Sequence, residues 1–345
     1  MIEPCRAAVR PRVVSPETGD VVPLEDEVAV WLEGNSRTLR IVGGPGSGKT
    51  TAIRHLATIY GARNDVILVD DGGTAQENVV TDPRRLIYSA SAEPPATLDA
   101  TLRLASWNDD DLLEYCLARH RPRCSSIIGR IRAMCDARRL HGVPQLWTLV
   151  IDAFAADDTA NDWRAVLEGE LARTVSEVDA AIIRHWCLSE LLGREKKATV
   201  SLRLLQKRRR HAKSIPWIRH RAAHAVLAAA HVLYLLGTER KPFFLEYIWP
   251  DDLRDETASL LAVAPAAQRR LNQIVIGKQE RYQGTAATLL YAAEQGWQPP
   301  PGTQAKLSGA VFTGASWRGI DLSHARLQKV DFSGADLSGA RLEQI

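Results

Sequence analysis

The first third of the chain alternates short apolar runs with turns that contain glycine and proline. Four of these runs predict buried strands: Thr38–Val42, Val66–Val69, Leu86–Tyr88 and Thr101–Leu104. A stretch with helical character, Ala52–Tyr60, follows the first of them. Apolar strands joined through a helix are typical of a parallel sheet. We therefore expect an α/β fold in this part of the chain.

The middle of the chain has the periodicity of helices. Asn108 is placed to cap a helix, because Asp111 stands three residues later and apolar residues follow. Apolar side chains also recur at helical spacing further on, at Val178, Ile182 and Trp186. The stretch Ala222–Leu236 is apolar on nearly all sides, which predicts a central buried helix.

The last part of the chain repeats every five residues after a proline-rich linker. A small or aliphatic residue opens each repeat, and a large apolar residue follows two positions later. The large positions are Leu307, Phe312, Trp317, Leu322, Leu327, Phe332, Leu337 and Leu342. Successive repeats of so short a period predict a solenoid that buries one stripe of side chains.

Composition is that of an ordinary globular protein, with 345 residues, 45% hydrophobic and 25% charged. The net charge of +3 is too small to indicate a class of partner. The five cysteines include no C-x-x-C pair, so we expect free thiols in a reducing compartment. Charges and prolines interrupt the first residues, and the longest apolar stretch, Ala222–Gly237, is too short to span a bilayer comfortably. These features predict a cytoplasmic protein without a membrane segment.

The segment GGPGSGKTT at residues 43–51 carries the most specific chemical pattern. Its glycines allow backbone N–H groups to surround phosphates. Lys49 supplies a positive charge for the β- and γ-phosphates, and the Thr50 hydroxyl can join the ligand shell of Mg²⁺. The helix that follows adds the positive end of its dipole. The pattern predicts a nucleotide site formed by Gly43, Gly44, Pro45, Gly46, Ser47, Gly48, Lys49, Thr50 and Thr51. The alternative is a glycine-rich turn that binds nothing.

Two carboxylates, Asp70 and Asp71, end the apolar run Val66–Val69. We expect Asp70 to hold Mg²⁺ through water, and Asp71 to orient or activate an attacking water, with Lys49 as the second catalytic residue. An Asp base is shorter than the more common Glu, which predicts slow hydrolysis. In the alternative interpretation, the pair ends a strand and opens a turn at Gly72.

The most basic stretch is Arg194–Arg221, which could bind nucleic acid or an acidic partner. Leucines interleaved with these charges favour instead the solvated face of a packed helix. His220, His224 and His231 lie near one helical line, but no carboxylate or cysteine completes a metal site. We therefore expect these histidines to have core or surface roles.

The C-terminal repeat resembles the pentapeptide-repeat family, whose pattern is A-[DN]-L-x-x. The resemblance implies a short right-handed quadrilateral β-helix of two turns. Trp317 is larger than the residues usual at its position, so we expect a distorted corner there. The last apolar stripe, around Leu337, Leu342 and Ile345, has no further coil to cover it, whereas Ala286–Ala293 can cover the first. We therefore expect the free end to contact a protein partner or a second copy of the chain.

Residues 38–155 resemble the signal-transduction NTPases of the NACHT and NB-ARC group (STAND). The likeness is carried, in the family's order, by Gly43–Thr50, Val66–Asp71, Arg85–Pro94, Leu102–Leu117 and His141–Val150. It implies Mg²⁺ with ATP or GTP, and contact between Pro144 and adenine. A proline in the first turn of a helix is the simpler interpretation of Pro144, and Asp152 fits that helix better than a Walker B strand.

Two features depart from this family. Only about twenty residues separate Lys49 from Asp70, where the family inserts a further helix and strand. Either the sheet is reduced, or Asp70 lies on a neighbouring strand and has no Walker B role. In addition, Ser91 and Ala92 stand where the family has a sensor arginine.

Together these patterns predict an α/β P-loop NTPase core, followed by an α-helical region and a short right-handed quadrilateral β-helix. The expected divisions are residues 1–37 (N-terminal extension), 38–107 (reduced core), 108–298 (helices) and 299–345 (linker and repeats). The function that fits best is a nucleotide-dependent switch that controls assembly with partner proteins, with slow or no hydrolysis. The alternative is a non-hydrolysing adaptor or scaffold, associated with nucleic acid through the basic stretch.

Overall fold

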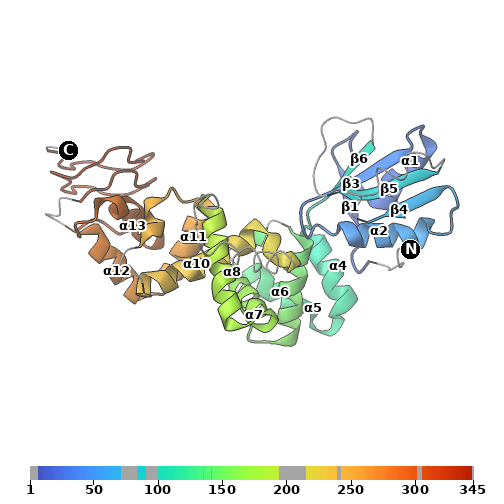
Figure 1. Cartoon of the computed structure of the whole chain (residues 1–345), viewed down its shortest axis with the longest axis horizontal. Coiled ribbons are helices and arrows are strands. Elements are labelled where there is room, and N and C mark those ends of the chain that lie inside the picture. The colour runs from blue at the N-terminus through green and yellow to red at the C-terminus, as the bar shows by residue number, and fades with distance from the viewer. Residues whose placement is uncertain are drawn as a thin grey trace. The chain divides into compact units, whose positions relative to one another are not determined.

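The computed structural model describes residues 7–70, 84–90, 100–134, 136–140, 142–193, 215–238, 242–300 and 305–343. The chain divides into two compact units. The N-terminal unit comprises Met1–Gly169 with Ile215–His220, and the C-terminal unit comprises Glu170–Ser214 with Arg221–Ile345. The described residues contain a mixed six-stranded sheet, eleven α-helices and the C-terminal coils (Figure 1).

The sheet of the N-terminal unit has the strand order β2-β1-β6-β3-β5-β4. Its strands are β1 (Arg12–Val14), β2 (Val21–Pro23), β3 (Thr38–Val42), β4 (Val66–Val69), β5 (Arg85–Ala90) and β6 (Ala100–Leu104). β3 lies between β5 and β6 and is parallel to both, and β4 is parallel to β5. The four strands that the apolar runs predict are therefore confirmed. β1 pairs antiparallel with β2 and β6, which makes the whole sheet mixed.

Helices α1 (Leu24–Glu33) and α2 (Lys49–Tyr60) share one hydrophobic cluster with the sheet. Alternate residues of β3, Leu39 and Ile41, belong to this cluster because successive side chains of a strand point to opposite faces. Each such side chain stabilises the fold by about 1.5–3 kcal/mol when it is fully buried. Arg40, between these two residues, belongs to the opposite face of the strand. Its Nε donates to Tyr88 Oη at 2.6 Å, so this buried arginine has a polar partner.

Four helices follow the sheet: α4 (Asp109–Arg119), α5 (Cys124–Ala133), α6 (Pro144–Ala156) and α7 (Trp163–Thr174). The predicted cap of α4 is confirmed as a reciprocal capping box. Asn108 Oδ1 accepts from Asp111 N at 3.1 Å, and Asn108 N donates to Asp111 Oδ2 at 2.9 Å. α6 begins at Pro144, so Asp152 is helical, as expected.

The described cysteines are free thiols. Cys116, Cys124 and Cys187 are buried without a disulfide, while Cys5 and Cys135 lie outside the described residues. Burial, together with the neighbouring Cys124, raises the pKa of the Cys116 thiol to about 12. This thiol is therefore inert at neutral pH.

The C-terminal unit contains α8 (Glu177–Leu191), α10 (Arg221–Thr238), α11 (Asp251–Leu261), α12 (Pro265–Val275) and α13 (Glu280–Ala293). α10 is buried along most of its length, which confirms the prediction for Ala222–Leu236. α8 is a helix as expected, but Val178 is 63% exposed, and the buried stripe runs through Ala180, Ile183, Cys187 and Leu188.

Two of the three histidines, His224 and His231, lie on α10, and His220 precedes it. His231 of α10 is buried, and its Nε2 lies 3.2 Å from Nδ1 of His185 on α8. Burial, with a smaller effect of the nearby His185, lowers the pKa of His231 to about 4. The ring of His224 packs edge-on against Trp186, and His220, in the N-terminal unit, is also buried.

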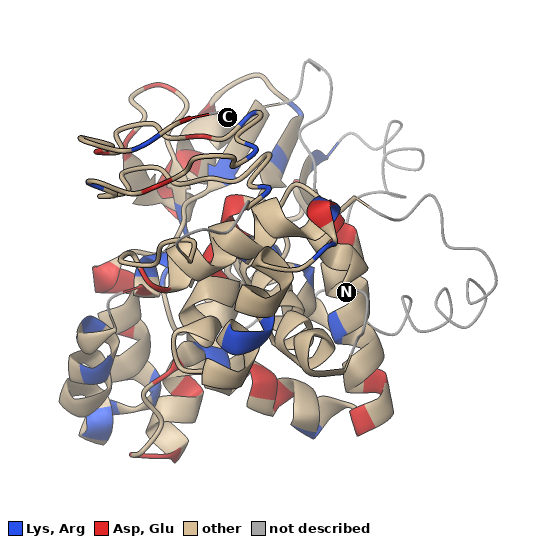
Figure 2. Cartoon of the chain, turned by 90° about the vertical axis from the view of Figure 1, so that its left-hand side faces the viewer, with Lys and Arg blue, Asp and Glu red and all other residues tan. Residues whose placement is uncertain are grey.

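The C-terminal repeats stack as coils of twenty residues. Parallel bridges join Lys306 to Arg326, Val311 to Asp331, Ser316 to Asp336 and Asp321 to Arg341. Each coil therefore contains four pentapeptides. Figure 2 shows residues of both charge signs along these coils, in agreement with the mixture of Lys, Arg, Asp and Glu in the repeats.

The corner at Trp317 is regular, so the expected distortion is wrong. Trp317 N donates to Asp336 O at 2.9 Å, close to the 2.8 Å between Phe312 N and Asp331 O in the preceding repeat. The large indole fits because its Nε1 donates to Trp297 O at 3.1 Å, outside the repeats.

Helix α13 covers the first coil, as the sequence predicted for Ala286–Ala293. Gln283 Oε1 accepts from Lys306 N at 2.8 Å, and Thr288 Oγ1 accepts from Val311 N at 2.9 Å. These two buried side chains satisfy N–H groups that would otherwise form an open edge. None of the described helices is long and apolar enough to cross a bilayer.

Candidate ligand site at the carboxyl edge of the sheet

A sharp turn connects β3 to α2. Gly46 has φ +65° and Gly48, which precedes the first residue of α2, has φ +92°. Both angles lie in the left-handed region that glycine adopts at least cost. No described side chain caps α2. The positive end of the α2 dipole and the first N–H groups of this helix therefore adjoin the turn without a cap from a described side chain between them.

Lys49 lies over this turn. Its Nζ donates to Gly43 O at 2.7 Å and to Gly44 O at 2.9 Å. These contacts fold the ammonium group back onto the loop. They place one positive charge beside the N-terminal end of α2, where an anion is favoured.

Asp70 and Ser89 meet at the same edge of the sheet. Asp70 follows β4, Ser89 lies near the end of β5, and Ser89 Oγ donates to Asp70 Oδ1 at 2.8 Å. Because β3, β5 and β4 are parallel, their carboxyl ends share the edge from which the loop also departs. Sequence reasoning missed Ser89; its signal was a serine directly after the apolar run Leu86–Tyr88.

The position of Asp70 bears on the two alternatives left open by its short distance from Lys49. α2 ends at Tyr60 and β4 begins at Val66, so no further helix or strand lies between them. β5 separates the strand that precedes Asp70 from β3, so Asp70 follows a strand that is not adjacent to the one before the loop. Asp71, Ser91 and Ala92 lie outside the described residues.

A cavity of about 640 Å³ lies at this edge, within the size range of small-molecule sites. It is lined by Pro45–Thr51, Asp70, Ser89 and Pro144, among others. The structure thus brings Asp70 and Pro144, which lie far along the chain from the loop, to the same cavity as Lys49 and Thr50. Gly43 and Gly44 do not line the cavity; their carbonyl groups hold Lys49.

The loop contacts the start of α6 and lies close to His220, which follows the 3₁₀ turn Pro216–Arg219. Gln145 N donates to Gly46 O at 3.2 Å, and a Cβ atom on Gly46 would lie 2.3 Å from His220 Nε2. Within the described residues, the buried atoms Ser47 Oγ and Gln145 Oε1 have no hydrogen-bond partner. Buried polar atoms without partners are costly, and both residues line the cavity, so a polar ligand could supply the missing contacts.

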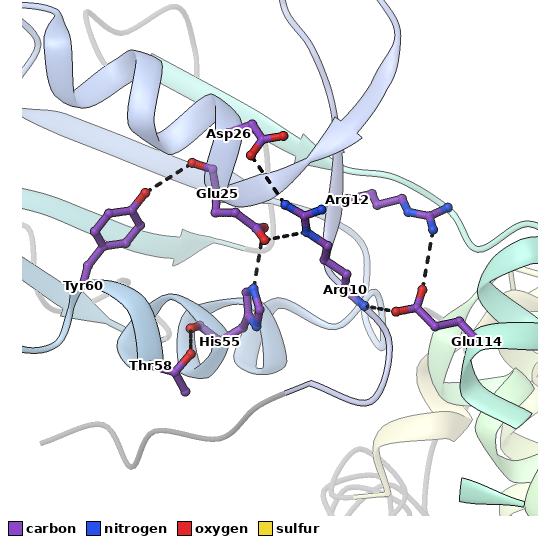
Figure 3. Close-up of polar contacts among 8 residues, drawn as sticks. All are labelled: Arg10, Arg12, Glu25, Asp26, His55, Thr58, Tyr60 and Glu114. Carbon is purple, nitrogen blue, oxygen red and sulfur yellow. Dashed lines mark hydrogen bonds and ion pairs between the residues drawn. The ribbon is translucent and has the colours of Figure 1, made fainter. Parts of the chain in front are cut away.

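The N-terminal segment Ala8–Arg12 forms another wall of the cavity and is held by ion pairs (Figure 3). Arg10 Nε lies 2.5 Å from Glu25 Oε1 of α1, and Arg10 N donates to Glu114 Oε1 of α4 at 3.1 Å. Arg12 pairs with Glu114 at 3.5 Å and with the buried Asp111 at 3.1 Å. Burial raises the pKa of Asp111, although the Asn108 N–H and the charge of Arg12 act in the opposite direction.

An aromatic pair completes the lining. The rings of Trp107, which follows β6, and Tyr115 of α4 have centroids 5.6 Å apart. Tyr115 Oη donates to Asp152 Oδ1 at 3.1 Å, and His120 Nε2 lies 2.7 Å from the same oxygen. Burial and the charge of Asp152 raise the pKa of Tyr115. Tyr115 is therefore a fixed hydrogen-bond donor at neutral pH.

Most of the basic stretch Arg194–Arg221 lies outside the described residues. At its described end, Arg219 lines the cavity, and Arg221 Nε lies 2.5 Å from Asp252 Oδ2. Binding of nucleic acid by this stretch stays a prediction, which a salt-dependent titration with DNA or RNA tests.

Comparison with protein families matches the C-terminal repeats. The family model for pentapeptide repeats matches eight copies over residues 305–344. No curated protein matches the chain at a significant level. The end of the chain therefore consists of pentapeptide repeats, and the match does not extend to the loop and sheet that form the cavity.

Proposed function

We propose that this chain binds a nucleoside triphosphate with Mg²⁺ in the cavity at the carboxyl edge of the sheet. The observation that carries the proposal is the convergence of Lys49, Thr50 and Asp70 on one cavity. Ligands of open α/β sheets bind outside the carboxyl ends of the strands, where connections leave in opposite directions. The loop N–H groups and Lys49 would hold the phosphates, as the GGPGSGKTT pattern indicates.

The donor set suits a magnesium–phosphate complex better than a free metal ion. Mg²⁺ is usually held by one or two protein oxygens together with phosphates and waters. Thr50 and Asp70 can supply such oxygens, and Ser89 fixes the orientation of the Asp70 carboxylate. Among the described residues there is no group of three or more His, Cys, Asp or Glu side chains placed to hold a metal ion.

In this proposal, the nucleotide acts as a switch for assembly with other proteins. The loop touches α6 through Gly46 and Gln145 and approaches His220 closely. A nucleotide that favours one loop conformation would therefore also favour one arrangement of these contacts. The switch function is drawn from the resemblance to the NACHT and NB-ARC group, and ATP and GTP are equal candidates for the nucleotide.

Magnesium nucleotide is expected to raise the melting temperature of the protein, and Lys49→Ala is expected to remove most of the rise. At a ligand concentration a hundredfold above Kd, linkage predicts about 2.7 kcal/mol of stabilisation. The measurement is thermal unfolding with Mg-ATP, Mg-GTP or neither, after bound nucleotide has been assayed. Lys278→Ala, at an exposed lysine, is the matched control. An unchanged curve for nucleotide-free wild type at millimolar ligand would contradict the proposal.

We further propose slow hydrolysis, with Asp71 as the residue that orients the attacking water. Asp71→Asn is expected to keep nucleotide affinity within a few-fold and to lower phosphate release by about a hundredfold. Asp70→Asn should instead weaken binding of the magnesium complex. The measurement is single-turnover phosphate release beside equilibrium binding. Equal turnover in Asp71→Asn would contradict the assignment, and a wild type that binds without turnover would support the non-hydrolysing adaptor.

We propose that the second coil of the β-helix, whose apolar stripe is only partly buried, binds a protein partner or a second copy. The large residues of the first coil are fully buried, whereas Leu327, Phe332 and Leu337 of the second coil are half-buried and Leu342 is 42% exposed. Ile345 lies outside the described residues.

Leu342→Glu is therefore expected to weaken assembly and to leave nucleotide binding unchanged, because it places a charge on the apolar stripe. Gln328→Glu adds the same charge at an exposed position of the same coil and serves as control. Light scattering after size-exclusion chromatography reports the assembly. A protein that stays monomeric at high concentration, and whose native complex survives Leu342→Glu, would show that this end is only exposed.

A further inference from the structure

The strand order gives the cavity two chemically different sides. The loop leaves β3, which has β5 and then β4 on one side and β6 on the other. The β5–β4 side carries the polar pair Ser89 and Asp70. The β6 side carries Trp107, which follows the end of β6 and lines the same cavity. A ligand with a charged end and an aromatic end would therefore have one preferred direction in this cavity.

Trp107 is held in place from two sides. Its backbone N–H donates to Gly142 O at 2.8 Å, which joins the segment after β6 to the segment that enters α6. Gly142 has φ +62°, and a Cβ atom there would lie 2.6 Å from Trp107 O, so glycine permits this approach. On the other side, the Trp107 ring packs at 45° against Tyr115.

The partners of Trp107 are themselves fixed. The hydroxyl of Tyr115 is anchored to Asp152 on α6. Pro144 lies two residues after Gly142, at the first turn of α6, and also lines the cavity. The indole thus stands in a preformed apolar wall near the loop, and a preformed wall lowers the entropic cost of binding a flat ring.

We propose that Trp107 is the base-stacking residue of this site, so that the site selects a nucleotide over an inorganic polyphosphate. The inference rests on the nucleotide binding proposed above and adds the base to it. In this arrangement the phosphates lie toward Lys49 and Asp70, and the base lies over the indole on the β6 side. Stacking on an aromatic side chain accepts any base. Trp107 therefore determines the class of ligand, and the choice between ATP and GTP is made elsewhere.

The decisive experiment compares Mg-ATP with magnesium tripolyphosphate as calorimetric probes. Wild type is expected to bind Mg-ATP more tightly than tripolyphosphate. Trp107→Ala is expected to weaken Mg-ATP binding by roughly tenfold to a hundredfold, the range for loss of one stacking contact. Its affinity for tripolyphosphate should change less than about twofold, because the phosphate contacts of the loop are unaltered. Trp107→Phe, which keeps an aromatic face, should retain most of the Mg-ATP affinity.

Intrinsic fluorescence supplies an independent readout. The chain contains nine tryptophans, so the contribution of Trp107 is the difference between wild type and Trp107→Phe. Mg-ATP should quench this difference signal, and tripolyphosphate should leave it unchanged.

Three results would overturn the inference, each in a distinguishable way. Equal loss of both probes in Trp107→Ala would make Trp107 a structural residue. Equal affinity of wild type for the two probes would make the site a polyphosphate site. Failure of wild type to bind either probe would remove the proposed nucleotide function itself.

Discussion

Trp317→Ala is expected to destabilise the C-terminal unit by about 3–5 kcal/mol, the range for truncation of a buried large aromatic side chain. The Trp317 side chain is fully buried, and its ring centroid lies 6.2 Å from that of Tyr291 on α13, the helix that covers the first coil. Its ring centroid lies 4.5 Å from that of Phe312 and 5.9 Å from that of Phe332. The substitution would leave a large void in both coils and would remove the partner of Trp297 O.

Urea unfolding followed by circular dichroism measures this loss. Trp317→Phe keeps most of the apolar volume and should lose less stability than Trp317→Ala. Arg318→Ala changes the next residue, whose side chain is 76% exposed and pairs with Asp336; because exposed ion pairs contribute about 0–1 kcal/mol, this variant should stay within about 1 kcal/mol of wild type. If Trp317→Ala were as stable as Arg318→Ala, the indole would not be a central element of this unit.

The repeats were predictable because each position has the same role in every copy. The position of Leu307 is repeated through Leu342, so the pattern alone identifies the inward stripe and the coil. The effect of Trp317, which is larger than the residues usual at its position, was not predictable. The bulk of Trp317 suggested a distorted corner, but the hydrogen bond to Trp297, a residue outside the repeats, allows a regular one.

In the sheet, local pattern predicted the four parallel strands but not their neighbours at the edge. β1 and β2 have three residues each, and their pairing depends on contact with β6, far along the chain. Such short strands have no periodicity of their own. Likewise, α8 has apolar residues on more than one side, so the spacing of Val178 and Ile182 indicated a helix but not its buried face.

For the candidate site, the loop was evident from its glycines and Lys49, because the phosphate-binding pattern is local. The pairing of Ser89 with Asp70 was not, since it requires β5 to lie between β3 and β4, and chain order does not reveal this. The place of Trp107 beside the loop depends on the same strand order. For this reason Ser89 and Trp107 could not be assigned to the site from the sequence.

Gly46→Ala is expected to damage both the N-terminal unit and nucleotide binding. A side chain at φ +65° costs about 1–2 kcal/mol. The new Cβ would also lie 2.3 Å from His220 Nε2 and 2.6 Å from Gln145 Oε1. Overpacking of this kind typically costs 1–3 kcal/mol, so the loss of unfolding free energy should be about 2–5 kcal/mol. Gly129→Ala, on α5 and outside the cavity, is the matched control, because a Cβ atom there meets nothing within 4 Å.

The contact between the loop and His220 can be separated from the backbone cost by a double-mutant cycle. In a His220→Ala background the obstructing ring is absent, so Gly46→Ala should cost at least about 1 kcal/mol less than in wild type. The backbone cost at φ +65° should remain, because it does not depend on the neighbour. Melting curves and Mg-ATP titrations of the four proteins separate the backbone cost from the cost of the contact with His220. Additive effects of the two substitutions would show that the loop does not press against His220, and would remove the contact through which we propose that nucleotide acts on the rest of this unit.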